Sequence, residues 1–314
     1  MADATFQTAA DVLSNWREDV LSGKPPTLYP VGVGALQRIE IGPGLVLLLG
    51  GAPGAGKTAF TMQAVVDALR LTPTLRAVCC NVEMPPAVLL DRQLARLSGI
   101  DLTHIRYRRL GAEHSNRIDQ ALATLEPLAE RLAFVRPPFD LANVARTTDE
   151  FDAHLILLDY IQRILPPGDH GDKRGSVNAT MDYLRKFADA GTAVIVISAI
   201  GRTKDKKGRS SYAGDGLNLA SFRESSELEF GCDDAYLLVP DVTNETGVIL
   251  RHLKSRHGEL QDLPLTFNGK LQRFESVVLD DKQRVEKATV RSTLEALWNR
   301  TPPADDDDAG IGDD

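Results

Sequence analysis

The most regular feature of this chain is a series of short apolar segments separated by stretches with helical spacing. Because apolar runs that alternate with helices are typical of a parallel sheet covered on both faces, we predict an α/β fold with a mostly parallel twisted sheet flanked by helices. Strands are expected at 45–50, 76–82, 132–136, 154–159, 193–199, 234–239 and 247–254, and helices at 57–70, 85–98, 114–130, 140–150 and 175–190. The sequence Thr-Asn-Glu-Thr-Gly at 243–247 predicts a C-terminal β-hairpin between the last two strands.

The N-terminal segment has the spacing of an amphipathic helix over residues 8–22. Gly23 and the following Lys-Pro-Pro end it. This helix either packs on its own domain or forms an arm that docks on a neighbouring subunit. We therefore divide the chain into an N-terminal linker or oligomerisation helix (1–30), a central domain (31–280), and a C-terminal part (281–314) with a helix expected over 284–299 and a disordered acidic tail. The apolar residues of the N-terminal helix are Val12, Leu13, Trp16, Val20 and Leu21.

A glycine-rich segment lies between the first apolar strand and the helix after it. Residues 51–58 fit G-x-x-x-x-G-K-[ST], a loop whose inward backbone N–H groups and helix N-terminus cradle phosphates. Lys57 is expected to reach the β- and γ-phosphates of ATP, and Thr58 to ligate Mg²⁺. An ordinary glycine turn is the alternative. The residues expected to contact nucleotide are Gly51, Ala52, Pro53, Gly54, Ala55, Gly56, Lys57, Thr58 and Ala59.

Composition indicates a soluble globular protein. The 314 residues, 43% of them hydrophobic, suffice for one large α/β domain or two small ones. The sequence has neither an apolar run of membrane-spanning length nor a signal-peptide pattern, so we expect no membrane association. The three cysteines (79, 80 and 232) form no metal-ligand pattern, and the first two lie in an apolar run. We therefore expect a cytoplasmic, reduced protein.

The net charge is informative only when the positions of the charged residues are considered. The formal charge of −8 argues against nucleic acid as a partner. However, residues 301–314 hold six aspartates and no lysine or arginine, so the rest of the chain carries only −2. A nearly neutral domain of this kind is able to bind DNA through local basic loops.

Two acidic residues follow apolar strands and are candidates for the chemistry. Asp159 ends the run Leu155–Leu158 and should emerge at the carboxyl edge of the sheet, where it would hold Mg²⁺ directly or through water. Glu83 follows the strand at 76–82 and precedes Met84 and two prolines, so it should lie at the same edge. Glu83 either faces the γ-phosphate and activates water or simply stabilises a helix start.

Five segments, in chain order, resemble the motifs of replicative DNA helicases of the DnaB type, whose motor is a RecA-like P-loop NTPase. Asn-Val-Glu-Met-Pro at 81–85 resembles Ser-Leu-Glu-Met-Pro, and the strand at 156–162 resembles Ile-Val-Ile-Asp-Tyr-Leu-Gln. Residues 220–225 resemble Leu-Ser-Asp-Leu-Arg-Glu-Ser, residues 254–258 resemble Lys-x-Arg-x-Gly, and 264–274 resemble the closing strands. The resemblance covers about residues 30–275.

This resemblance implies roles for individual residues. Glu83 would be the catalytic carboxylate, and Lys254 and Arg256 would reach the γ-phosphate bound by the adjacent subunit. Arginine suits that task because its planar fork stabilises charge spread over phosphate oxygens. A pair of exposed basic residues on a last strand is the alternative. A homo-oligomer, either a hexameric ring or a filament, follows from the resemblance, as does a loader or other replication partner.

Two charged, glycine-containing segments, 163–175 and 202–209, are expected to be loops and resemble the central-channel loops of the family. They follow the strands at 154–159 and 193–199, and their cations would neutralise the phosphates of single-stranded DNA without reading its sequence. Solvated surface loops are the alternative. The candidate DNA-binding residues are Arg163, Lys173 and Arg174 in the first, and Arg202, Lys204, Lys206, Lys207 and Arg209 in the second.

One departure from the family pattern concerns coupling. The family has Ser-Gln-Leu-x-Arg after its fourth core strand, where this chain has Ser-Ala-Ile-Gly-Arg, so Ala199 replaces the glutamine that senses the γ-phosphate. Because an alanine cannot hydrogen-bond, Ala199 counts against coupling between hydrolysis and DNA movement but not against ATP binding. The resemblance as a whole implies Mg²⁺-dependent ATP hydrolysis coupled to translocation on single-stranded DNA and unwinding in DNA replication. The alternatives are a DNA- or partner-binding regulatory ATPase that hydrolyses ATP without unwinding, favoured by Ala199, and a recombinase-like filament.

Overall fold

The computed structural model describes residues 6–201, 203–204, 210–211, 217–222, 227–241 and 244–277. The chain divides into two compact units, Met1–Ser276 and Val277–Asp314. The helix expected over 284–299 and the acidic tail lie outside the described residues. No helix in the described part of the chain is long and apolar enough to cross a membrane.

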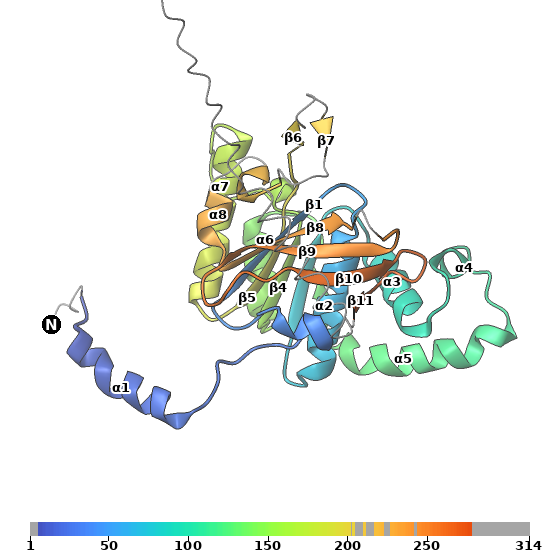
Figure 1. Ribbon diagram of the computed structural model, residues 1–314, viewed down its shortest axis with the longest axis horizontal. Helices are drawn as coiled ribbons and strands as arrows, with labels where there is room; N and C mark the ends of the chain where they lie inside the picture. The colour runs from blue at the N-terminus through green and yellow to red at the C-terminus, as the bar shows by residue number, and fades with distance from the viewer. Residues whose placement is uncertain are drawn as a thin grey trace, which may run out of the picture. The chain divides into compact units, whose positions relative to one another are not determined.

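A mixed sheet forms the centre of the first unit (Figure 1). Among the described residues it has nine strands in the order β11-β10-β9-β8-β1-β5-β4-β2-β3. The strands from β8 to β3 pair in parallel, whereas β8–β9, β9–β10 and β10–β11 pair antiparallel. The predicted parallel sheet and its closing hairpin are thus confirmed. The strands are β1 Val46–Gly51, β2 Ala77–Asn81, β3 Leu132–Phe134, β4 Leu155–Asp159, β5 Ala193–Ile197, β8 Asp234–Pro240, β9 Gly247–Ser255, β10 Leu263–Asn268 and β11 Arg273–Ser276.

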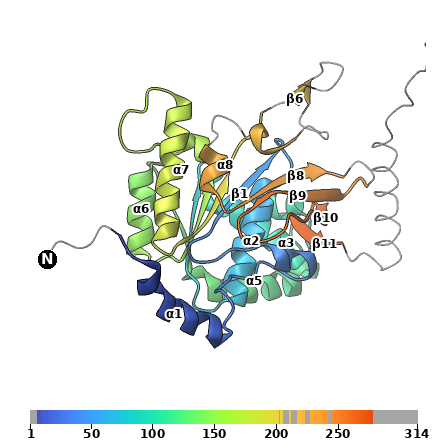
Figure 2. The same cartoon turned by 60° about the vertical axis from the view of Figure 1, so that its left-hand side comes forward.

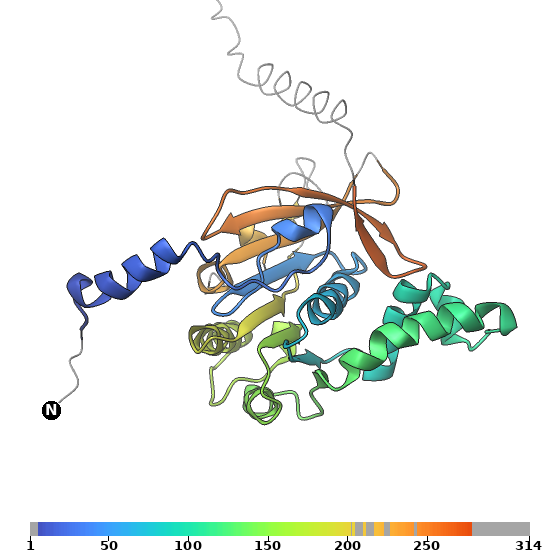
Figure 3. The ribbon, with the colours of Figure 1, turned by 90° about the horizontal axis from the view of Figure 1, so that it is seen from below.

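Helices cover both faces of the sheet, as Figure 2 shows. Side chains alternate along each strand, so Leu47 and Leu49 of β1 join the core beneath α2, α3 and α5, while Val46 and Leu48 join the core beneath α6, α7 and α8. Figure 3 shows the orange antiparallel strands continuing the sheet on one side. The helices are α2 Lys57–Leu71, α3 Pro86–Ser98, α5 Ser115–Ala129, α6 Leu141–Glu150, α7 Lys173–Asp189 and α8 Glu227–Gly231.

Some smaller elements were not predicted. These are the short helix α4 (Leu102–Arg106), the two-stranded pair β6 (Thr203–Lys204) and β7 (Ser210–Ser211), and the 3-10 turns η1 Gly34–Arg38, η2 Ala112–His114, η3 Ile161–Arg163 and η4 Leu219–Ser221. One boundary was wrong. The segment at 163–175 was expected to be a loop, but α7 begins at Lys173 because the Asp172 carboxylate caps it by accepting the N–H of Gly175.

The N-terminal helix α1 (Ala9–Ser22) has a capping box between Thr8 and Asp11 and ends at Gly23, whose φ of 64° is left-handed. None of its residues is buried. The apolar face predicted from the sequence is accordingly open, with Trp16 57% exposed and Leu21 72% exposed.

Candidate nucleotide site

The carboxyl ends of four neighbouring parallel strands converge at one edge of the sheet. The glycine loop follows β1, Glu83 follows β2, Asp159 ends β4, and Ala199 follows β5. Because this edge is where open α/β sheets bind ligands, the sheet brings together residues that are far apart in the sequence.

The glycine loop has the backbone geometry that the motif requires. Gly54 and Gly56 have φ values of 80° and 90°, which favour glycine, and Gly56 directly precedes the first residue of α2. A Cβ on Gly56 would also lie 2.9 Å from Phe274 Cζ and 3.2 Å from Phe267 Cε1. The loop therefore needs glycine at position 56 for both conformation and space.

Lys57 points back across this loop. Its Nζ donates hydrogen bonds to the carbonyls of Gly51 at 2.8 Å and Ala52 at 3.0 Å. Burial lowers the pKa of the Lys57 ammonium, while the negative charges of Asp159 and Glu83 oppose that shift. A partly buried cation whose hydrogen bonds, within the described part of the chain, go to backbone carbonyls is well placed to exchange them for phosphate oxygens.

Thr58 and Asp159 form the other half of the site. The Thr58 hydroxyl donates to Asp159 Oδ2 at 2.6 Å, and Asp159 is 4% exposed. Burial raises the pKa of the Asp159 carboxyl, the hydrogen bond from Thr58 lowers it, and the nearby Glu83 raises it again. The site thus holds a buried carboxylate whose charge a bound cation would compensate.

Glu83 lies on the turn between β2 and α3, which Asn81 organises. The Asn81 side-chain carbonyl accepts the N–H groups of Glu83 at 3.0 Å and Met84 at 2.8 Å, and its amide donates to Asp159 Oδ2 at 2.7 Å. The carboxylates of Glu83 and Asp159 therefore sit on segments that one asparagine joins.

A cavity of about 450 Å³ joins these residues. Sequence reasoning identified the glycine loop, Lys57, Thr58, Glu83 and Asp159, and it noted Ala199 as a departure. It missed the residues that reach the cavity from α3 and from the closing strands, since no local pattern indicates which helix or strand position faces a loop elsewhere. The lining residues are Pro53, Gly54, Gly56, Lys57, Thr58, Glu83, Met84, Arg92, Asp159, Tyr160, Ile197, Ala199, Phe267 and Gln272.

Arg92 stands out among the missed residues. It extends from α3 into the cavity, and its Nε is buried without a hydrogen-bond partner in the described part of the chain. Burial lowers the pKa of its guanidinium, and the Asp159 charge opposes this. An unpaired buried N–H costs free energy, so this donor faces a place where an anion would satisfy it.

Lys254 and Arg256 lie elsewhere and are absent from the residues that line this cavity. Lys254 is near the end of β9, and the antiparallel register pairs it with Ala235 at the start of β8. Since β8 is parallel to β1, both basic residues lie at the amino edge of the parallel strands. The glycine loop is at the other end of β1, a strand that spans about 17 Å at roughly 3.3 Å per residue. These cations cannot complete the cavity of their own subunit.

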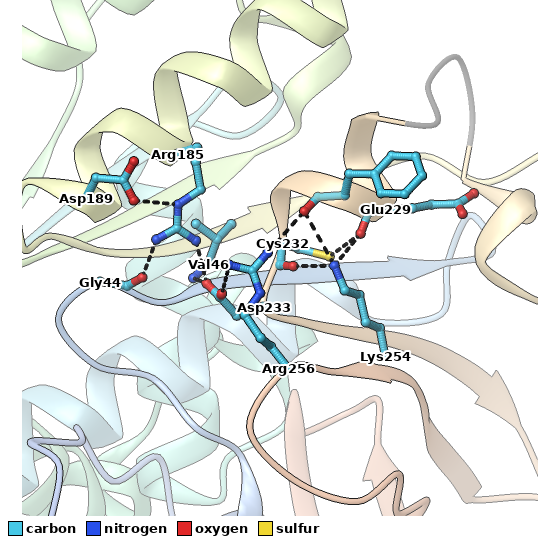
Figure 4. Close-up of polar contacts among 10 residues, drawn as sticks. Gly44, Val46, Arg185, Asp189, Glu229, Cys232, Asp233, Lys254 and Arg256 are labelled. Atoms are coloured by element: carbon cyan, nitrogen blue, oxygen red, sulfur yellow. Dashed lines mark hydrogen bonds and ion pairs between the residues drawn. The ribbon is translucent and has the colours of Figure 1, made fainter. Parts of the chain in front are cut away.

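Polar contacts hold both side chains at that edge (Figure 4). Lys254 Nζ donates to the carbonyls of Glu229 at 2.6 Å and Cys232 at 2.7 Å. Arg256 Nη1 lies 3.0 Å from Asp233 Oδ1, and its side chain is 45% exposed. Arg256 thus keeps an exposed guanidinium, whereas Lys254 is engaged with backbone carbonyls.

The predicted DNA-binding residues are only partly described. Arg163 ends the turn after β4, and Lys173 and Arg174 open α7; all three are exposed. Lys204 belongs to β6. Arg202, Lys206, Lys207 and Arg209 lie outside the described residues, as do residues 223–225 of the third resembling motif.

Comparison with known proteins gives one family and several relatives. The protein-family model described as DnaB-like helicase C terminal domain matches residues 36–276 of this chain. Replicative DNA helicase DnaB of Treponema pallidum (strain Nichols) is 26% identical over 247 residues, or 77% of this chain and 52% of that protein. Its counterpart from Buchnera aphidicola subsp. Acyrthosiphon pisum (strain APS) is 25% identical over 259 residues, or 77% of this chain and 53% of that protein. This chain therefore spans about half the length of these curated relatives.

Two solved structures share the fold. One, described as an ATPase domain, matches with a TM-score of 0.75 and 18% identity over 87% of this chain and 99% of that chain. A DnaB-like replicative helicase, described together with its interactions with primase, matches with a TM-score of 0.74 and 18% identity over 88% of this chain and 68% of that chain. Both agree with the predicted RecA-like architecture.

Proposed function

The chain belongs to the family of DnaB-like helicase C-terminal domains, and from this premise we propose that it is a Mg²⁺-dependent ATPase that drives movement on single-stranded DNA and unwinding in DNA replication. One observation carries the proposal. The glycine loop, Asp159 and Glu83 meet at one sheet edge, while the exposed Arg256 lies at the opposite edge. Each subunit then offers a nucleotide cavity at one edge and a cation for a neighbour's cavity at the other.

The cavity residues fit ATP and magnesium. The Thr58 hydroxyl and the Asp159 carboxylate, which lie 2.6 Å apart, are the oxygen ligands that Mg²⁺ prefers, and the remaining ligands would be water and phosphate. When bound, the ion neutralises phosphate charge. Lys57 exchanges its loop carbonyls for phosphate oxygens. Glu83, on the turn beside Asp159, orients and deprotonates the attacking water.

Arg256 completes the site in trans. Its guanidinium uses one N–H for Asp233 and one for the Phe230 carbonyl, at 3.3 Å, which leaves other N–H groups for a phosphate on a neighbouring subunit. The family resemblance implies that Lys254 also reaches the γ-phosphate of the neighbouring subunit. In the single subunit its ammonium donates to carbonyls at the end of α8. Lys254 would therefore contact a neighbour's phosphate only if assembly of the oligomer broke these hydrogen bonds.

Assembly into a ring or filament is supported by α1. Its apolar face is exposed, and a groove of about 240 Å³ between α2, α3 and α5 is lined by Leu90, Leu94, Leu122 and Leu125. We assign this groove to α1 of a neighbouring copy. Trp16→Glu should then lower the oligomer mass in light scattering, and Glu18→Lys, on the opposite face of α1, should not. Equal masses for the two variants would exclude this contact.

Single-stranded DNA is the proposed substrate track. Arg163, Lys173 and Arg174 are exposed cations in the turn and helix that follow β4, the strand whose last residue is the proposed metal ligand Asp159. Phosphate contacts of this kind hold the backbone without reading sequence.

A second candidate function rests on Ala199. This residue lines the nucleotide cavity where the resembling motif has glutamine, and its methyl group cannot hydrogen-bond to a phosphate. A regulatory ATPase that hydrolyses ATP without unwinding would be built this way. Its DNA-stimulated hydrolysis would proceed with no strand displacement.

Strand displacement on a forked duplex, measured beside ATP hydrolysis, separates the two functions. The helicase proposal predicts ATP-dependent displacement that Glu83→Gln abolishes and that Glu130→Gln, an exposed carboxylate at the end of α5, leaves intact. Hydrolysis without displacement at all protein concentrations would support the regulatory ATPase. Full hydrolysis by Glu83→Gln would contradict the assignment of Glu83 in either function.

A further inference from the structure

Asn81 occupies a central position that the proposed roles leave unexplained. It is the last residue of β2, it is 7% exposed, and it pairs in register with Asp159 at the end of the neighbouring strand β4. The Val82 N–H also donates to the Asp159 carbonyl at 2.9 Å. The two strands are therefore joined at the point where both candidate acidic residues emerge.

The Asn81 side chain uses its donor and its acceptor in different directions. Its amide group donates to Asp159 Oδ2 at 2.7 Å, the same oxygen that accepts from Thr58. Its carbonyl accepts both the Glu83 N–H and the Met84 N–H. These contacts fix the turn on which Glu83 leaves the strand.

Few side chains could make this set of contacts. Aspartate would keep the carbonyl-like acceptor but lose the donor, and it would place a second negative charge beside Asp159. Serine, which stands at this position in the resembling motif Ser-Leu-Glu-Met-Pro, offers a single hydroxyl on a shorter stem. Alanine would leave the two backbone N–H groups without this acceptor.

We propose that Asn81 is a positioning residue that holds the Glu83 turn and the Asp159 carboxylate in a fixed relation, so that the water-activating group and the metal ligand act on one phosphate. The proposal rests on the assignment of Glu83 and Asp159 in the proposed function. Asn81 is absent from the residues lining the nucleotide cavity, so its effect passes through these neighbours. Nucleotide affinity, which depends mainly on the glycine loop and Lys57, should not depend on it.

The test compares Asn81→Ala, Asn81→Ser and Asn81→Asp by steady-state ATP hydrolysis and by equilibrium binding of a fluorescent ATP analogue. Misplacing a catalytic group by about 1 Å costs up to about 100-fold in rate. We expect kcat to fall about 10- to 100-fold in Asn81→Ala, at least as far in Asn81→Asp, and less in Asn81→Ser. The dissociation constant of the analogue should change less than about threefold in Asn81→Ala and Asn81→Ser.

The control is Asn143→Ala, which removes an asparagine that also donates to the backbone, here to the carbonyls of Arg136 and Pro138, and that is absent from the residues lining the nucleotide cavity. Its kcat should be unchanged. If Asn81→Ala does not fold, the smaller Asn81→Ser, which adds no charge beside Asp159, decides the matter. A structural role alone predicts normal kcat in this variant if its thermal unfolding is normal.

A parallel measurement on Glu83→Gln distinguishes failure of this inference from failure of the proposed function. Suppose that Glu83→Gln loses most of its activity but keeps a measurable single-turnover rate. If the double variant with Glu83→Gln and Asn81→Ala has the same rate, Asn81 acts through Glu83. If Glu83→Gln loses its activity but folded Asn81 variants keep full kcat, the positioning role is overturned. It is also overturned if the affinity of the Asn81 variants for nucleotide falls by the same factor as their kcat. If Glu83→Gln retains full activity, the proposed function itself fails.

Discussion

The Arg256 guanidinium lies 3.0 Å from the carboxylate of Asp233, which is 2% exposed and also accepts the N–H of Val46 at 2.8 Å. Val46 is the first residue of β1, and the glycine loop begins at the last residue of that strand. One buried strand therefore connects the proposed finger to the nucleotide loop of the same subunit.

Replacing Arg256 should separate activity from stability. Without Arg256, Asp233 still accepts from Arg185 Nη1 at 2.7 Å and from Val46, so the loss of unfolding free energy should stay below about 1 kcal/mol. ATP hydrolysis by the oligomer should fall by about 10³-fold, as expected when an arginine finger is removed. Steady-state hydrolysis and thermal unfolding measure both. Arg251→Ala, on strand β9, which ends just before Arg256, is the matched control, and equal activity of the two variants would count against a finger at 256.

Asp159→Asn should stabilise the nucleotide-free protein while removing its activity. Because the pKa of Asp159 is raised in the folded state, the folded state binds its proton more tightly than the unfolded chain. Stability is then lost as pH rises from the ordinary carboxyl pKa through the raised one. Asparagine does not titrate and can still accept from Thr58 and Asn81. We expect a gain of about 1 kcal/mol at neutral pH that vanishes in acid.

Thermal unfolding from pH 4 to pH 8 measures this difference. The control is Asp101→Asn, since hydrogen bonds from Thr103 lower the pKa of Asp101 and the substitution should shift stability in the opposite direction. A less stable Asp159→Asn across the whole range would mean that burial of its charge is already compensated in the free protein.

Arg92→Gln should weaken nucleotide binding without weakening the fold. The substitution removes a cation whose Nε is buried without a partner among the described residues, so the free protein should be as stable as the wild type or more so. Loss of a charged hydrogen bond to phosphate should raise the dissociation constant for ATP about 10-fold or more. Arg109→Gln, an exposed arginine after α4, serves as control. Unchanged affinity in a folded Arg92→Gln would show that this side chain does not reach the nucleotide.

Reversing Lys173 and Arg174 to glutamate should weaken single-stranded DNA binding and lower its salt dependence, by about 0.7 in slope for each phosphate that is no longer neutralised. These residues open α7, where acidic side chains favour the helix by about 0.3–1 kcal/mol each. Weaker binding in a protein that is no less stable would therefore report DNA contact. Lys186→Glu in the last turn of α7 should bind DNA normally. If all variants bind alike, this segment is only a solvated surface.

The elements and the cavity were not equally predictable from the sequence. Asp159 and Glu83 were placed at one edge because each follows an apolar run, and parallel strands end together. Arg92, Phe267 and Gln272 could not be placed, since they reach the cavity by packing of α3 and β10–β11 against the loop. The start of α7 was misjudged because the glycines and charged residues at 168–175 are typical of a loop, whereas the Asp172 carboxylate caps a helix that begins at Lys173. The opposite position of Arg256 required the strand order, which local patterns do not contain.

Mixing two inactive variants tests the composite site most directly. Lys57→Ala should fail to hold ATP, and Arg256→Ala should fail to complete its neighbour's site. In a mixed oligomer, the intact cavity of an Arg256→Ala subunit meets the intact Arg256 of a Lys57→Ala subunit. We predict that ATP hydrolysis by the mixture recovers to a clear fraction of the wild-type rate. A rate equal to the average of the two separate variants, in oligomers shown to exchange subunits, would contradict a site shared between neighbours.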